Sequence, residues 1–182
     1  MVETADHGSE KKIRNTLTWN GDGPDRAEAQ KMKKARVGLT KTRNDDDRLV
    51  VIAMIVRQIL VQRHGKNNLS LQCRWAAVTI DRLFKKLGMT GGSLRSGWIS
   101  KAGDRAHGHI WNRIKTDNGV RLLDATLTQF HPQAPANIYG PYQETARMYD
   151  YIEDGLGPYR YDVYEVDDTL VDEALALLSD SV

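Results

Sequence analysis

The sequence predicts an α+β fold in which helices pack on an antiparallel sheet. Three observations support this prediction: two helical segments come first, a hairpin of alternating strands follows, and the chain closes with one more strand and one more helix. With 182 residues, of which 40% are hydrophobic, the chain has room for one domain with a buried core and a tail.

Residues 1–47 are predicted to form a flexible N-terminal segment ahead of a catalytic domain over 48–182. The segment is rich in Lys, Arg, Asp, Asn and Gly, and its few large apolar residues form no clear face. Its last residues, Asn44-Asp45-Asp46-Asp47, suit the N-terminus of a helix, because capping and acidic side chains are favourable there. We therefore expect a buried helix over 48–63, which ends at His64-Gly65.

The second helix is predicted over 73–87, after a loop over 66–72. Its apolar side chains recur on or near one face, and Gly88 ends it. The following Thr90-Gly91-Gly92-Ser93 is expected to continue as a loop. A phosphate cradle is an alternative function for the Gly-rich stretch at 88–93, although the full nucleotide-binding pattern is missing.

An antiparallel hairpin is predicted over 109–124. Two alternating runs flank a turn at 116–119, and Asn-Gly between such runs is a strong hairpin signal. After a Tyr- and Pro-rich stretch, residues 159–166 alternate as a third strand. The residues Asp167-Asp168-Thr169 then cap a final helix that runs to Leu178.

The single cysteine of the chain, Cys73, is predicted to open the second helix. Backbone amides and the positive end of the helix dipole favour a thiolate there, and the same amides can bind an oxyanion. His109 begins the first hairpin strand and Asp124 ends the second, so a tight turn brings the two side by side. We expect a catalytic triad in which Cys73 attacks a carbonyl, His109 shuttles the proton and Asp124 orients His109.

Three fragments carry a resemblance to a known superfamily: Cys73-Arg74-Trp75-Ala76, Gly108-His109-Ile110-Trp111-Asn112 and Leu123-Asp124-Ala125-Thr126-Leu127-Thr128-Gln129-Phe130. They resemble the papain-like cysteine hydrolases of transglutaminase-like order, in which a helix-start Cys, a strand His and a strand Asp follow one another. The group includes transglutaminases, bacterial effector cysteine proteases, protein deamidases and arylamine acyltransferases. The resemblance covers roughly residues 48 to 166 and implies a papain-like fold.

The resemblance implies a thiol hydrolase, with cysteine protease as the favoured activity on a protein or peptide substrate. A glutamine deamidase or a transglutaminase-like acyl transferase is the alternative, and no metal or organic cofactor is required. A non-catalytic binding module on the same scaffold, with an inert cysteine, is the alternative from another class.

Secondary site residues are expected around the triad. Papain-like enzymes often add an oxyanion side chain shortly before the nucleophile, and Gln72, Asn67 and Asn68 are the candidates. Trp111 is expected either to cover the imidazole on the substrate side or to pack in the core. The walls of a substrate groove are expected at Thr90–Gly103 and at the Tyr-rich segment 139–161.

Two alternatives concern the other histidines. His107 lies two residues before His109 on the same face of an extended segment, and is its chief competitor as the base. A mixed zinc site of Cys73, His107, His109 and Asp124 is also conceivable, although structural zinc sites rarely rely on one cysteine.

Charge and hydropathy limit the classes of partner that we expect for this chain. The net charge is only +2, so nucleic acid is not expected as the main partner. No apolar run reaches the roughly 18 residues that span a bilayer. The N-terminus lacks the basic-then-apolar order of a secretory signal, so we expect a cytoplasmic protein or one delivered into another cell's cytosol.

Overall fold

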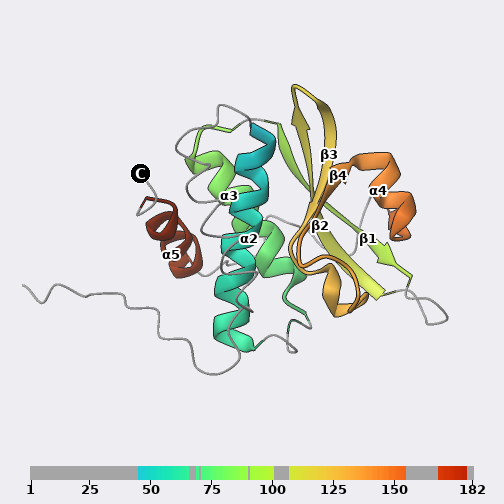
Figure 1. The fold of residues 1–182 in the computed structure, drawn as a ribbon, viewed down its shortest axis with the longest axis horizontal. Coiled ribbons are helices and arrows are strands. Elements are labelled where there is room, and N and C mark those ends of the chain that lie inside the picture. Colours follow the sequence, from blue (N-terminus) through green and yellow to red (C-terminus); the bar gives the residue numbers. More distant parts are fainter. Residues whose placement is uncertain are drawn as a thin grey trace, which may run out of the picture.

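The computed structural model describes residues 45–65, 69, 71–89, 91–100, 107–154 and 168–179. The helices are α2 (Asp45–His64), α3 (Cys73–Lys86), η1 (a 3-10 helix, Leu127–Gln129), α4 (Tyr142–Met148) and α5 (Asp168–Ser179). The strands are β1 (Gly92–Ile99), β2 (His107–Thr116), β3 (Gly119–Asp124), β4 (Ile138–Pro141) and β5 (Tyr151–Glu153). Helices α2, α3 and α5 gather on one side of the sheet and α4 lies on the other (Figure 1).

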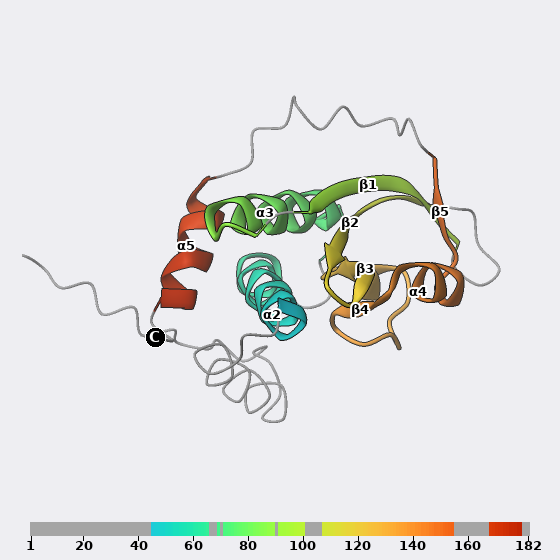
Figure 2. The same ribbon diagram turned by 90° about the horizontal axis from the view of Figure 1, so that it is seen from above.

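The strands form one antiparallel sheet in the order β4-β3-β2-β1-β5, which confirms the predicted α+β class. The sheet curves around α4, which packs on β3, β4 and β5 (Figure 2). On the opposite face α3 packs along β2, where Asn112 Nδ2 donates to the Ala77 carbonyl at 2.9 Å. This bond fixes the position of α3 along β2.

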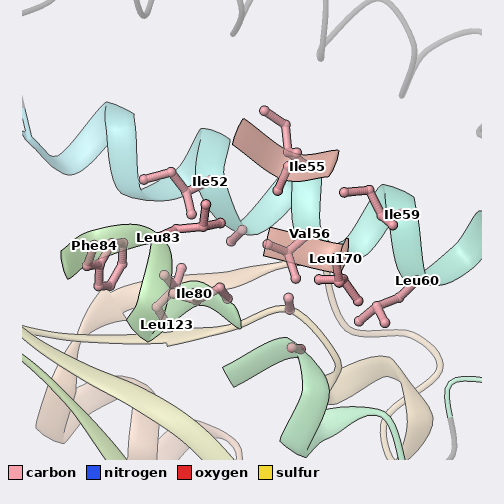
Figure 3. Close-up of a cluster of buried hydrophobic side chains, with 14 of the residues drawn as sticks. Ile52, Ile55, Val56, Ile59, Leu60, Ile80, Leu83, Phe84, Leu123 and Leu170 are labelled. Atoms are coloured by element: carbon pink, nitrogen blue, oxygen red, sulfur yellow. The ribbon is translucent and has the colours of Figure 1, made fainter. Parts of the chain in front are cut away.

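Helix α2 is apolar on nearly every side because it is enclosed by α3, α5 and the sheet. Figure 3 shows its side chains Ile52, Ile55, Val56, Ile59 and Leu60 packed with Ile80, Leu83 and Phe84 of α3, Leu123 of β3 and Leu170 of α5. A second cluster lies on the α4 side of the sheet and consists of Ile99, Trp111, Leu122, Leu127, Ile138 and Tyr151. None of the helices in the described ranges is long and apolar enough to cross a bilayer.

The two N-terminal helices, the hairpin and the final helix are confirmed close to their predicted bounds. The first helix begins earlier than predicted, because Asp46 is tied to the hairpin turn. Asp46 Oδ2 accepts a hydrogen bond from Asn118 Nδ2 at 2.9 Å and lies 3.7 Å from Arg121 Nη2. Residues 45–47, predicted to be flexible, therefore belong to α2. Residues 1–44 and the predicted strand over 159–166 lie outside the described residues.

The loop predicted over Thr90–Ser93 is wrong from Gly92 onward, because Gly92–Ile99 form β1, a strand that was not predicted. The glycines of β1 are required because neighbouring atoms come close to them, and not because the chain turns there. A Cβ on Gly92 would lie 3.0 Å from Phe84 Cδ2, and one on Gly97 would lie 1.9 Å from the Ile152 carbonyl oxygen of β5. The short elements β4, α4 and β5, within the Tyr-rich segment, were not predicted.

Candidate active site

Cys73 is the first residue of α3 and lies beside the core clusters rather than within them. The residue is 9% exposed. The N-cap residue Gln72 accepts the Ala76 N–H at 2.9 Å, so α3 starts at the predicted place. A helix start leaves amide N–H groups without acceptors inside the helix, and Cys73 lies at that start.

His109 and Asp124 lie on neighbouring strands at the same end of the hairpin. Asn112 pairs with Leu123 across β2 and β3, so Asp124 comes opposite Trp111. His109 lies two residues further along β2 on the same face, diagonally across from Asp124. His109 Nε2 and Asp124 Oδ2 are 2.6 Å apart, and both side chains are buried. The histidine has its Nδ1 left for the thiol.

Asp124 is held by further donors. The backbone N–H and the hydroxyl of Thr126 donate to Oδ1 at 2.7 and 3.0 Å, and the Tyr151 hydroxyl donates to Oδ2 at 2.6 Å. Burial alone raises the pKa of Asp124, but the charge and hydrogen bond of His109, with the bonds from Tyr151 and Thr126, lower that pKa below its ordinary value. The carboxylate therefore stays ionised although it is buried.

Cys73 and His109 shift one another's pKa in the directions that favour a thiolate beside an imidazolium. Burial raises the pKa of the Cys73 thiol, yet the hydrogen bond and charge of His109 and the Ile110 N–H lower it overall. Burial lowers the pKa of His109, yet the charge and hydrogen bond of Asp124, followed by those of Cys73, raise it to about 9. A thiolate beside an imidazolium is the nucleophilic form of such a pair.

Aromatic rings surround the imidazole. Phe130 lies edge-on to His109 with ring centroids 5.1 Å apart, and Trp111 is stacked 6.1 Å away. Trp111 is buried, and its Nε1 donates to the Tyr142 hydroxyl at 3.2 Å. The burial of Trp111 fits the core-packing alternative and not the predicted contact with substrate. Phe130 takes the position that covers the imidazole.

Of the three predicted oxyanion residues, only Gln72 lies in the described part of the chain. Gln72 is half-buried, and its Oε1 is buried with no hydrogen-bond partner in the described part of the chain. Asn67 and Asn68 lie outside the described residues. Sequence reasoning missed Gln129, at the end of η1, whose Nε2 is 3.5 Å from His109 Nδ1. Its amide therefore lies beside the ring nitrogen of His109 that is not bonded to Asp124.

His107 does not take the place of His109. It is exposed at the start of β2 and stacks on Phe130 with ring centroids 5.2 Å apart. Among the described residues no group of three or more Cys, His, Asp and Glu side chains is arranged to hold a metal ion. The predicted phosphate loop borders a cavity of about 260 Å³ that Arg48, Lys115 and Asp117 also line. Thr90 of that loop lies outside the described ranges.

The site also contains supports that the sequence did not reveal. Tyr151 was one of seven tyrosines in the chain, and no local pattern distinguished it. The segment after Asp124 is braced from α2 by Arg57, which donates to the Ala125 carbonyl at 2.7 Å and to Thr128 Oγ1 at 2.9 Å. The signal for Arg57 was its position inside an apolar helix, where a charged side chain needs a partner.

No protein-family model matches the chain, and neither the curated proteins nor the solved structures contain a significant match to it.

Proposed function

We propose that the chain is a thiol hydrolase that acts on amide bonds of a protein or peptide substrate and has a papain-like, transglutaminase-like fold. One observation carries the proposal: a helix-start thiol interacts with an imidazole that is itself hydrogen-bonded to a buried carboxylate. These are the nucleophile, the base and the orienting group that acyl transfer needs.

In the proposed reaction the Cys73 thiolate attacks the carbonyl carbon, and the carbonyl π electrons move to oxygen. The oxyanion collapses, the C–N bond breaks, and protonated His109 gives its Nδ1 proton to the leaving amine. A thioester remains on Cys73. Water then attacks the thioester while His109 accepts a proton from it. The resulting oxyanion collapses, the C–S bond breaks, the carboxylic acid leaves, and the thiolate–imidazolium pair is restored.

The oxyanion is proposed to accept hydrogen bonds from the Cys73 backbone N–H and the Gln129 side chain. The first donor belongs to the free amides at the start of α3. The second is supported by the Gln129 amide, which lies 3.5 Å from the nitrogen that faces the reacting carbon. Gln72, adjacent to Cys73, is the competing side chain.

We place peptide-bond cleavage ahead of glutamine deamidation or transamidation, although all three pass through one thioester. A peptidase must admit substrate backbone on both sides of the sulfur. The support is a set of exposed apolar side chains: Leu71, two residues before Cys73 in the chain, and the strand partners Trp98 and Ile152. Trp98 also pairs with Gly108, two residues before Ile110 on β2.

Intact-mass spectrometry of candidate protein substrates, with the native chain and with Cys73→Ala, tests the proposal. Cys73-dependent fragments indicate a peptidase, a gain of about one dalton a deamidase, and a larger amine-dependent gain a transglutaminase. The alternative of an inert binding module requires that no substrate mass changes and that the thiol reacts with iodoacetamide no faster than an ordinary cysteine.

A further inference from the structure

Two large apolar side chains lie exposed next to one another at one end of the sheet. Trp98 of β1 is 41% exposed and Ile152 of β5 is 55% exposed. They are direct partners in the antiparallel register, so their side chains share one face. On its other side Trp98 pairs with Gly108 of β2, which contributes no side chain. We call Trp98, Ile152 and the backbone of Gly108 the apolar platform.

The platform continues the face on which α3 lies. Ala77 of α3 is bonded to Asn112, and one turn earlier the Cys73 sulfur accepts the Ile110 N–H. The next β2 residue on this face is Gly108, and α3 begins only at Cys73, beside Ile110. The apolar platform is therefore the part of the face that lies just beyond the nucleophile.

Leu71 is another exposed apolar residue close to the nucleophile in the chain. It lies two residues before Cys73, is 82% exposed, and has a positive φ of 65°. An exposed leucine adds little to a core, and the left-handed conformation is unfavourable for a residue with a branched side chain. Backbone strain of this kind clusters at ligand clamps, which points to a contact made by Leu71 with a bound molecule.

We propose that the apolar platform and Leu71 bind a large apolar side chain of the substrate, within three residues of the attacked amide. This inference rests on the proposed thiol hydrolase function. Gly108 and Ile110 are two residues apart on β2, which is about 7 Å along a strand. An extended substrate covers that distance in about two residues.

The neighbouring charge indicates which substrates are excluded. Asp154 follows Ile152 by two residues, and its Oδ1 lies 3.3 Å from the Ser96 hydroxyl on the same face. A carboxylate at this edge of the platform repels an acidic side chain. We therefore expect Leu, Phe or Met to be preferred at the bound position and Asp or Glu to be rejected.

Covalent inactivation provides the test, because it separates binding from thiol reactivity. Alanine-based tripeptide chloromethyl ketones, with Leu, Phe, Ser or Asp at each position in turn, are compared with iodoacetamide. For every variant the inactivation rate is divided by the iodoacetamide rate. At one position Leu or Phe should react about 10- to 100-fold faster than Ser, with Asp slowest.

Substitutions test which residues cause the preference for Leu or Phe over Ser. Trp98→Ala and Ile152→Thr should each reduce the Leu-over-Ser ratio at least several-fold, whereas Met148→Ser, a change of another exposed apolar residue, should leave the ratio unchanged. If Trp98→Ala lowers the melting temperature strongly, the Leu-over-Ser ratio of the milder variant Ile152→Thr tests the inference. A reactive thiol with no apolar preference, or with a preference that survives both substitutions, overturns this inference alone. A thiol that is slow toward iodoacetamide overturns the proposed function itself.

Discussion

The Tyr151 hydroxyl and the Asp124 carboxylate are joined by a 2.6 Å hydrogen bond at Oδ2, the oxygen that also lies 2.6 Å from His109 Nε2. The other oxygen, Oδ1, is occupied by Thr126. The carboxylate thus has no rotational freedom, and it fixes the ring of His109 with Nδ1 toward the thiol. Tyr151 belongs to β5 and so connects the edge of the sheet to the hairpin that carries His109 and Asp124.

Replacing Tyr151 with Phe should remove one hydrogen bond to Asp124 without leaving a cavity in the core. The ring remains in the second cluster, but Asp124 loses one donor. We expect the free energy of unfolding to fall by about 1–3 kcal/mol, the cost of removing a hydrogen bond to a charged group. We expect kcat/KM to fall about tenfold, and we expect the dependence of kcat/KM on pH to change. Tyr149→Phe is the matched control, and equal effects in both variants would contradict the role given to Tyr151.

The three triad residues should differ in how much activity they support. Cys73→Ala should leave no activity above background, and His109→Ala nearly none, because both groups take part in bond making. Asp124→Asn should reduce kcat by about 10²- to 10⁴-fold, since it disturbs only the orientation and stabilisation of His109. Kinetics on folded variants, checked by circular dichroism, measure this order. A fully active Cys73→Ala would end the thiol hypothesis.

The pH dependence of thiol alkylation should report the ion pair. The pKa of Cys73 is lowered, so the iodoacetamide rate should rise and level off below the ordinary thiol range of about 8.5. Because the pKa of His109 is raised to about 9, the thiolate–imidazolium pair persists up to that pH and is lost above it. His109→Gln should move the first inflection upward. A single inflection at the pKa of a small thiol, in both chains, would contradict the pairing.

Local signals explain why part of this fold was predictable. A buried helix, a helix-start cysteine and an Asn-Gly turn are each encoded within a few residues. The hairpin register then places His109 and Asp124 on one face as diagonal neighbours, because Asp124 comes opposite Trp111. The strand β1 was missed because Gly92 and Gly97 resemble loop residues, although they are required by Phe84 and by the β5 backbone. Tyr151 and Gln129 reach the site through tertiary packing, which no local pattern shows.

Matched substitutions of two glutamines should identify the oxyanion donor. Gln129→Ala should lower kcat by about 10²-fold with little change in KM, because an oxyanion donor acts mainly in the transition state. Gln72→Ala should have the smaller effect. Steady-state kinetics on one substrate measure both variants. The reverse order would move the role to Gln72, and an effect confined to KM would make Gln129 a substrate-binding residue instead.

The boundary of the folded domain should lie at Asp45, and truncation can locate it. The composition of residues 1–44 predicts that their removal leaves a cooperative melt with an unchanged midpoint. Removing residues 1–47 also deletes Asp46, and this should lower the free energy of unfolding by about 1–3 kcal/mol through the lost bond to Asn118. Asp46→Ala in the full chain should reproduce most of that loss.

The same carboxylate makes the loss depend on pH. Burial raises the pKa of Asp46, but the nearby Tyr139 hydroxyl, the hydrogen bond from Asn118, the nearby Thr116 hydroxyl and the charge of Arg121 lower it overall. A carboxyl whose pKa is depressed by folding contributes stability above its unfolded pKa, and loses it as the pH falls through the folded value. The difference between the native chain and Asp46→Ala should therefore be full at pH 7 and shrink below pH of about 4. A difference that stays constant down to the acid transition would show that Asp46 acts through packing rather than charge.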